Sequence, residues 1–489
     1  MTARPLRIES ALDVSPEALH EISQQVSQLV TDYFANISDR SVIENNYAGK
    51  TISEIDPSLE LDPVPVEKLI AECQTMIELS RHNGHPRFFG YVASPSTPIG
   101  AYGDLIASAV NANITCWRSD PAGTEIEKVV VKWLGSLIGY DDNAHGLLTS
   151  GGSMANLIAL LIAHRRKAGT DISRTGLWNS GPPMTVYASE EVHMSVAKGA
   201  DILGFGRDHV RAVRCDERFR IDVHALRERI EEDLQNGLRP FCVVASAGTT
   251  NTGAVDPLPE VAAVAREFDL WFHIDGAYGA PGALDPLKKD LFAGLAEADS
   301  VSLDPHKWLY VPIDVGCLLF RDPATAKMFN TEEASYIKVH GLTDDETFAY
   351  WDYSVELSRR FRALKVWLTL RYYGVRKIAE AISGDIGLAA YLAEQVTQAA
   401  DFELLAPVEL SICCFRYVPE GVSDDAELSR LNEQILPLVQ KGGRAYVSNA
   451  MVNGKFALRA CITNFRTTKD DIDLTLEVIR TAGVLACRG

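Results

Sequence analysis

An acid and an amine, each at the end of an apolar strand-like run, are the residues whose types and spacing could do chemistry. Asp275 ends the run LWFHI within HIDGAYG, and Lys307 follows SVSL within SVSLDPHKWLY, one helix and one strand later. This ordered pair suits pyridoxal 5'-phosphate (PLP). The acid keeps the pyridine nitrogen protonated so that the ring accepts electrons, and the amine holds the aldehyde as a Schiff base. Because WLY follows Lys307, we expect burial to lower its pKa and make it nucleophilic; a surface lysine that caps a loop is the alternative.

A glycine-rich turn upstream offers a site for the phosphate. In HGLLTSGGSMANLIALLIAHRRKAG a short strand-like piece turns at 150–152 and enters an apolar helix. Free N–H groups and the positive end of the helix dipole favour an anion there, Gly151 and Gly152 permit close approach, and Ser153 adds a hydroxyl. The pattern is neither GxGxxG nor a P-loop, which disfavours nucleotides, and a purely structural glycine turn is the alternative.

Strand-like and helical segments alternate through the middle of the chain, as in TVYASE, FCVVASAG, WFHID and SVSLD. This alternation predicts an α/β fold with a mostly parallel sheet flanked by helices, which binds ligands beyond the carboxyl ends of its strands. Ser150, Thr250, Asp275 and Lys307 all follow strands, so one crevice could collect them. His193 opens a helix beside it, where it could stack on the cofactor ring or contact a substrate carboxylate.

The two ends of the chain predict smaller units. Helices from Ser15 and over 65–79 leave more apolar face than they can cover on each other, so we expect them to pack against another subunit or the main domain. A long helix over 357–372 is broken by Gly374. The last hundred-odd residues mix helices with strands such as SICCFRY and FALRACI, the pattern of a small α/β domain.

Two loop-like segments contain aromatic residues. The stretch 82–96 contains Phe88, Phe89 and Tyr91, which either line a pocket for an apolar side chain or anchor the loop in a core. The polar, aperiodic stretch 328–348 predicts a mobile flap. Its Tyr336 could deliver a proton once water is excluded, or could simply pack.

Composition excludes several classes of function. The net charge of −19 and pI of about 5.1 disfavour nucleic acid and anionic membranes as partners. Nine cysteines without CxxC spacing suggest neither a disulfide framework nor a metal site, and fit a reducing cytoplasm. No apolar run is long enough for a signal peptide or a membrane span. We therefore expect a cytoplasmic enzyme with a small-molecule substrate.

Four of these stretches, SVSLDPHKWLY, HIDGAYG, TSGGSMAN and LSRRFRALKVW, resemble the group II PLP-dependent amino-acid decarboxylases, closest to the aromatic-L-amino-acid decarboxylases. The resemblance implies a PLP fold type I homodimer with its active sites at the interface. It implies an N-terminal helical arm over 1–95, a large PLP-binding domain over 96–372 and a small C-terminal domain over 373–489.

The resemblance also implies roles for individual residues. Lys307 would form the Schiff base, Asp275 would pair with the pyridine nitrogen, and His193 and Ala277 would cover the two ring faces. Thr250 and His306 would be near neighbours of the cofactor, with the phosphate on Gly151, Gly152 and Ser153. Tyr336 aligns with the family's flap tyrosine. Asp304 departs from the pattern, because the animal enzymes have asparagine there.

The expected reaction is conversion of an L-amino acid to its amine and CO2. Phe89, Tyr91 and Trp117 favour an aromatic side chain, although each of them has a structural alternative, and tryptophan, tyrosine and dopa are not ranked. The rivals are a PLP-dependent aldehyde synthase or oxidative deaminase, a decarboxylase of a non-aromatic amino acid, an aminotransferase, and an inactive PLP-binding interaction protein.

Overall fold

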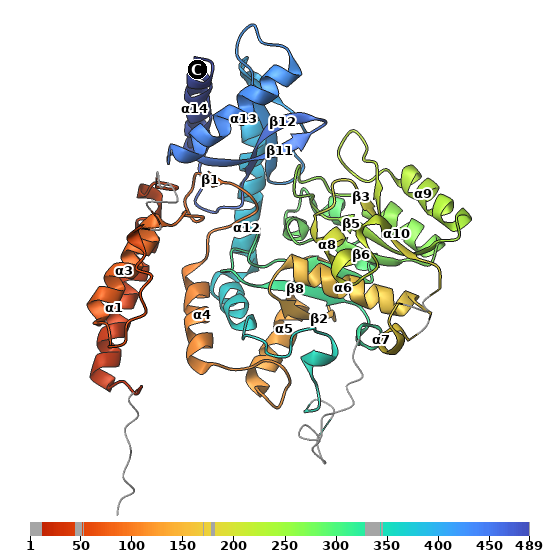
Figure 1. The fold of residues 1–489 in the computed structure, drawn as a ribbon, viewed down its shortest axis with the longest axis horizontal. Coiled ribbons are helices and arrows are strands. Elements are labelled where there is room, and N and C mark those ends of the chain that lie inside the picture. The colour runs from red at the N-terminus through yellow and green to blue at the C-terminus, as the bar shows by residue number, and fades with distance from the viewer. Residues whose placement is uncertain are drawn as a thin grey trace, which may run out of the picture.

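A computed structural model describes residues 12–44, 51, 53–169, 171–177, 181–327, 343 and 346–488. Its centre is a seven-stranded sheet in the order β2-β8-β7-β6-β5-β3-β4 (Figure 1). The strands are β2 (His145–Thr149), β3 (Met184–Ser189), β4 (Val210–Val213), β5 (Arg239–Ser246), β6 (Trp271–Asp275), β7 (Ser300–Leu303) and β8 (Gly316–Phe320). Pairing is parallel from β4 to β7, and β8 is antiparallel to both β7 and β2. Because only β8 runs the other way, the carboxyl ends of the other six strands share one edge.

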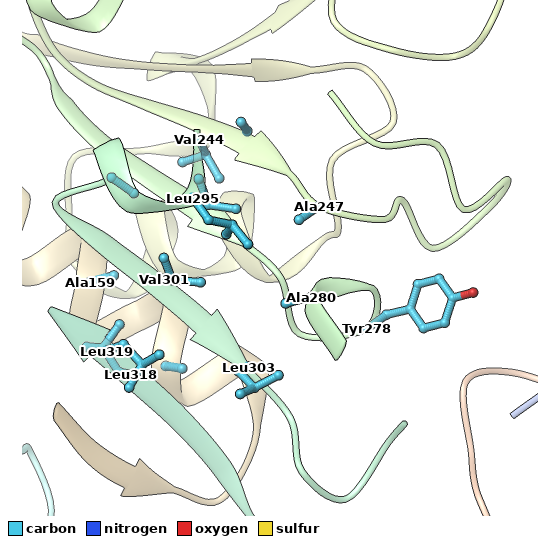
Figure 2. Close-up of a cluster of buried hydrophobic side chains, with 14 of the residues drawn as sticks. Ala159, Val244, Ala247, Tyr278, Ala280, Leu295, Val301, Leu303, Leu318 and Leu319 are labelled. Atoms are coloured by element: carbon cyan, nitrogen blue, oxygen red, sulfur yellow. The ribbon is translucent and has the colours of Figure 1, made fainter. Parts of the chain in front are cut away.

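Helices cover this sheet and bury it. The helix α6 packs along β5 to β8, and α9 and α10 pack against β4 to β6. Figure 2 shows part of the resulting core, where Ala159 of α6 lies with Val301 and Leu303 of β7 and with Leu318 and Leu319 of β8. Strands covered on both faces read as near-continuous apolar runs, which is why the sequence located them. The helices of this part are α4 (Pro98–Val110), α5 (Pro121–Leu137), α6 (Gly152–Lys167), α7 (Ile172–Thr175), α8 (Ser195–Ile202), α9 (Val223–Gln235), α10 (Leu258–Glu267) and α11 (Pro323–Ala326).

A second, five-stranded sheet has the order β1-β11-β12-β10-β9 and packs with α13 and α14. These elements are β1 (Phe88–Phe89), β9 (Phe402–Leu404), β10 (Ile412–Tyr417), β11 (Tyr446–Val452), β12 (Lys455–Cys461), α13 (Asp425–Lys441) and α14 (Lys469–Ala486). The strand β1 comes from the segment expected to be a loop, and it pairs in parallel with β11. Phe88 and Phe89 are therefore part of a sheet whose other strands all come from residues 402–461.

The helix α12 (Ala363–Gln398) links the two sheets. Gly374 has non-helical angles (φ 73°, ψ 153°), as expected of a helix breaker, yet helical structure resumes directly after it. Residues 363–398 thus form two helical segments that meet at a sharp kink at Gly374. Short 3-10 helices complete the described secondary structure: η1 (Ile37–Asp39), η2 (Arg207–His209), η3 (Ala280–Leu284), η4 (Lys289–Phe292), η5 (Leu295–Glu297) and η6 (Tyr350–Asp352).

The N-terminal helices α1 (Pro16–Ala35) and α3 (Val66–Leu79) form an arm beside the rest of the chain (Figure 1). The Ser15 side chain caps α1 by accepting a hydrogen bond from the Ala18 N–H. Neither helix buries any residue completely, although both have an apolar face. Within the described ranges, none of the helices combines the length and hydrophobicity needed to cross a membrane.

Candidate active site

A cavity of ≈ 290 Å³ opens at the shared edge of strand ends. All of the residues expected to hold the cofactor line it, from five separate segments: Gly151, Gly152, Ser153, His193, Thr250, Asp275, Ala277, His306 and Lys307. The other lining residues are Ser150, Met154, Asn156, Ser246, Gly248, Thr249, Tyr278 and Asp304. Residues more than 150 positions apart in sequence therefore meet, because each follows or ends a strand that reaches the same edge.

The glycine turn forms one wall of the cavity. Gly151 precedes α6 with φ 153° and ψ 175°, a conformation that favours glycine. A Cβ on Gly152 would lie 2.8 Å from the Cβ of Ala277, closer than carbon atoms pack. The first N–H groups of α6 have no acceptor within the helix, so the turn presents free donors at a positive helix end. A phosphate group fits these donors and the space that the missing side chains leave.

Asp275 ends β6 at the floor of the cavity and is 8% exposed. Its Oδ1 accepts from the Ala277 N–H and the Ser302 hydroxyl, both at 3.1 Å, and its Oδ2 accepts from Asn156 Nδ2 at 2.7 Å. Burial pushes the pKa of Asp275 up, but the charge of Lys307 and the Asn156 hydrogen bond outweigh burial and hold the pKa below its usual value. Asp275 is therefore a buried carboxylate that stays ionised, and an ionised acid is the partner that a protonated ring nitrogen needs.

Lys307 lies in different surroundings from those expected. Its Nζ is 3.0 Å from Asp304 Oδ2, and its side chain is 23% exposed. The aromatic residues that follow it turn away from the amine: Trp308 and Tyr310 both donate to the carboxylate of Asp385 on α12. The carboxylate of Asp304, rather than an apolar wall, is therefore the main neighbour of this amine.

Asp304 also has a free acceptor atom in the wall of the cavity. Its Oδ1 is buried without a hydrogen-bond partner among the described residues, and its side chain is 2% exposed. A Cβ on Gly152 would lie 3.0 Å from Asp304 Oδ2, so this carboxyl packs against the glycine turn. Buried polar atoms without partners are rare, so this oxygen is an unusual feature beside the glycine turn.

Two histidines border the cavity in their neutral form. The His193 Nδ1 is 2.8 Å from the Ser195 hydroxyl, and His306 Nδ1 accepts from the Val315 N–H at 3.1 Å. Burial is the main cause that lowers the pKa of both rings. A neutral imidazole can lie flat against an aromatic ring or hydrogen-bond a substrate without adding charge.

The residues expected to contact the substrate lie elsewhere. Phe89 is fully buried in the apolar core of the β9–β12 part of the chain, so its position matches the core-anchoring alternative. Tyr91 is 52% exposed, with its hydroxyl 3.2 Å from that of Tyr446. Trp117 donates its backbone N–H to the Phe348 carbonyl. None of the three lines the described cavity, and Tyr336 lies outside the described residues.

Sequence reasoning missed the polar residues beneath Asp275. Asn156 is 1% exposed and joins Asp275, His273 and Ser195. The signal was present, because an asparagine in the otherwise apolar helix after TSGGSMA needs buried partners. Within the described part of the chain, no three potential metal ligands of the His, Cys, Asp or Glu types come together. The donor set thus suits an organic phosphate with an aldehyde and a basic ring nitrogen.

Comparison with known proteins agrees with this chemistry. Residues 49–418 match the pyridoxal-dependent decarboxylase conserved domain. The aromatic-L-amino-acid decarboxylase of Bacillus atrophaeus is 34% identical, and the alignment covers 94% of each chain. A phenylacetaldehyde synthase of a Rosa hybrid cultivar is 30% identical over 93% of this chain and 91% of its own.

A solved structure extends the likeness to the whole fold. The crystal structure of Oryza sativa TDC with PLP and tryptamine superposes with a TM-score of 0.88 at 27% identity and covers 99% of both chains. The family match spans most of this chain, and the superposed fold includes both sheets. The chain therefore belongs to the pyridoxal-dependent decarboxylase family and is a PLP-dependent amino-acid decarboxylase of fold type I.

Proposed function

We propose that this enzyme decarboxylates an aromatic L-amino acid in the cavity between Asp275 and Lys307. The observation that supports the location most strongly is the meeting of an ionised buried acid, a lysine amine and a glycine turn in one cavity. PLP, when bound, supplies an aldehyde carbon for an amine and an electron-poor ring that accepts the electron pair left as CO2 departs.

Each part of the cavity has a task in this proposal. The turn at Gly151, Gly152 and Ser153 binds the phosphate through N–H groups and a hydroxyl. Asp275 would keep the ring nitrogen protonated, and Lys307 would supply the amine that binds the aldehyde.

The cofactor ring needs a fixed plane. His193 and Ala277 would cover the two faces of the ring, and Thr250 and His306 would border it. These residues would let the pocket set the substrate carboxylate perpendicular to the ring plane, which selects the bond that breaks. Tyr336, which lies outside the described residues, is the proposed donor of the proton that returns to Cα.

An aromatic substrate is supported by the relatives rather than by the three aromatic residues named from the sequence. The Bacillus atrophaeus relative has an aromatic amino acid in its name, and the rice structure contains tryptamine. The specific observation that favours a second candidate is the similarity to a phenylacetaldehyde synthase, which points to an aldehyde product from an aromatic substrate.

The test separates these products. PLP-loaded protein is incubated with the twenty amino acids and dopa, amines and aldehydes are identified by mass spectrometry, and oxygen uptake is recorded. An aromatic amine without oxygen uptake supports the proposal, and an aldehyde with oxygen uptake supports the second candidate. Lys307→Ala should abolish the product, while Lys289→Ala, at an exposed lysine of the same domain, should leave it unchanged. An amine derived only from a non-aromatic amino acid would refute the aromatic assignment.

We further propose a cytoplasmic homodimer with its active sites at the interface, built from units over 1–95, 96–372 and 373–489. The arm helices α1 and α3 bury none of their residues fully, and α4 exposes Leu105, Ile106 and Val110. Apolar faces of this extent suit a second copy of the chain. The mass from light scattering should be about twice 53.6 kDa, and a chain lacking the arm should become monomeric. All nine cysteines are free, which fits a reducing compartment.

A further inference from the structure

Asn156 occupies the centre of a buried polar network behind the cavity. It lies in the first turns of α6, and all three of its hydrogen-bonding contacts are to side chains of other elements. Its Nδ2 donates to Asp275 Oδ2 at 2.7 Å and to Ser195 Oγ at 2.9 Å, and its Oδ1 lies 3.0 Å from His273 Nε2. The side chain is therefore satisfied by three partners from β6 and α8.

The two end residues of this network, Trp271 and Asp275, determine which group donates and which accepts in each hydrogen bond between them. An indole N–H can only donate, and Trp271 Nε1 donates to Ser300 Oγ at 2.9 Å. An ionised carboxylate can only accept, so the Asn156 amino group must face Asp275 and its carbonyl must face His273. Burial lowers the pKa of His273 to about 4, so this ring is neutral at physiological pH and has one proton.

The carbonyl of Asn156 places the single proton of the neutral His273 ring on Nε2. His273 must donate through Nε2 to Asn156, and its Nδ1 then accepts from the Ser300 hydroxyl, 2.9 Å away. The chain runs one way, from Trp271 through Ser300, His273 and Asn156 to Asp275. Each donor polarises the next, which strengthens the last hydrogen bond to the carboxylate.

A branch of the network reaches His193. The Ser195 hydroxyl accepts from Asn156, so its single proton is free for His193 Nδ1 at 2.8 Å. The Ser195 backbone N–H also points to His193 Nδ1, at 3.3 Å, and a backbone N–H can only donate. The Nδ1 of His193 is thus an acceptor, and the neutral ring has its proton on Nε2.

We propose that Asn156 is a positioning residue of this active site, which holds Asp275 as a carboxylate toward the cofactor ring and fixes His193 in its Nε2-protonated form through Ser195. This inference rests on the proposed role of Asp275 and deepens it. Without Asn156, the carboxylate loses its shortest hydrogen bond and rotates more freely. The titratable groups that face Asp275 are Lys307, His193 and His273, and none of them replaces this donor at Oδ2.

The test compares two cofactors in protein without bound PLP. PLP and its 1-deaza analogue, in which carbon replaces the ring nitrogen, are titrated by fluorescence quenching over a range of pH. The ratio of the two dissociation constants measures the interaction between Asp275 and the ring nitrogen. The phosphate and the aldehyde are the same in both cofactors, so their contributions cancel in the ratio. Wild type should prefer PLP down to the lowest pH at which it stays folded. In Asn156→Ala the preference for PLP should be lost at a pH about one to two units higher than in wild type. A shift of this size corresponds to the free energy of one hydrogen bond to a charged group.

Two further variants keep the outcome clear. Asn156→Asp has nearly the same shape and adds a second carboxylate, so the loss of preference should move to still higher pH. Asn432→Ala is the matched control, since Asn432 is equally buried and bonded but lies in α13. It should lower stability without changing the ratio.

The outcomes distinguish this inference from the proposed function. If wild type binds PLP no better than the analogue at any pH, the role of Asp275 fails and the inference falls with it. If wild type prefers PLP and both Asn156 variants keep the same pH dependence, the role of Asp275 stands and the inference is overturned.

The branch to His193 has a test of its own. Shifts of 15N-labelled histidine distinguish the two tautomers, and the His193 signals are those lost in His193→Asn. Wild type should show the Nε2-protonated form alone, and Ser195→Ala should mix the two forms. Ser195→Ala keeps the backbone N–H at 3.3 Å and loses only the hydroxyl at 2.8 Å, so a single unchanged form would mean that the backbone sets the tautomer and would refute the branch through the hydroxyl.

Discussion

Asp385 is a buried acid whose charge should cost the folded enzyme stability at neutral pH. It is 1% exposed on α12, and its Oδ2 accepts from Trp308 Nε1 at 2.9 Å and from the Tyr310 hydroxyl at 2.7 Å. Burial raises its pKa to about 7, against the effect of these two donors. The unfolded chain loses this proton near pH 3.8, so between pH 4 and 7 the folded state holds more protons and stability falls as pH rises.

The magnitude follows from the shift. A rise from 3.8 to about 7 corresponds to about 4 kcal/mol at 1.36 kcal/mol per pH unit. Of this loss of stability, about 3 kcal/mol falls between pH 5 and 8.5. Asp385→Asn does not titrate, so it escapes this loss. The new side-chain amino group of this variant would be buried without an acceptor, because the site was built around a carboxylate, which only accepts. This should lower the free energy of unfolding by about 1–3 kcal/mol at every pH.

The assay is the Tm of wild type and Asp385→Asn from pH 5 to 8.5. The variant should be less stable than wild type at pH 5. By pH 8.5 its stability relative to wild type should rise by about 3 kcal/mol, which corresponds to about 6 °C in Tm at roughly 2 °C for each kcal/mol. Other titrating groups cancel in the difference. Asp290→Asn, at an exposed carboxylate of the same chain, should show no such trend. A difference in Tm that stays constant over this range would mean that Asp385 is ionised throughout, and the reasoning from burial would be wrong.

Three other predictions concern the elements around the cavity. Arg359 and Glu127 form an ion pair with both side chains at most 1% exposed, so Arg359→Met should lower the free energy of unfolding by about 3–5 kcal/mol, measured by urea denaturation. Gly152→Ala places a methyl 2.8 Å from the Cβ of Ala277, so PLP affinity measured by fluorescence should fall at least tenfold while the far-UV circular dichroism stays unchanged; equal affinity would contradict the cradle. Tyr336→Phe should divert the reaction toward oxidative deamination or stall it, and an unchanged rate of amine formation would count against the proton-donor role.

The sequence predicted the cavity well because the relevant information is local. Asp275 and Lys307 each follow an apolar run, and covered parallel strands make such runs continuous. Once the strands are parallel, their ends meet at one edge without any further information. The helix starting at Gly152 was predicted for the same reason, since glycine, serine and an apolar body are adjacent in sequence.

The misses share a different physical cause. Phe88 and Phe89 form a strand only because residues 446–447 lie beside them, and a two-residue strand has no periodicity of its own. The surroundings of Lys307 depend on Asp385, which is 78 positions away and lies beyond the helix break that the sequence correctly placed at Gly374. Which side chains meet across such a break depends on tertiary packing, which local patterns do not contain.

A buried polar side chain supports each of the three functional parts from behind. Arg359 donates to the Leu148 carbonyl just before the glycine turn, Asn156 donates to Asp275, and Asp385 accepts from both aromatic residues after Lys307. Apolar burial is not directional, whereas a buried polar group that loses its hydrogen-bond partner costs its full desolvation. These three residues therefore fix the distances between phosphate turn, acid and amine more sharply than the apolar core alone could. A cofactor with three rigidly connected binding groups needs that precision, because an error at one of them misplaces the other two.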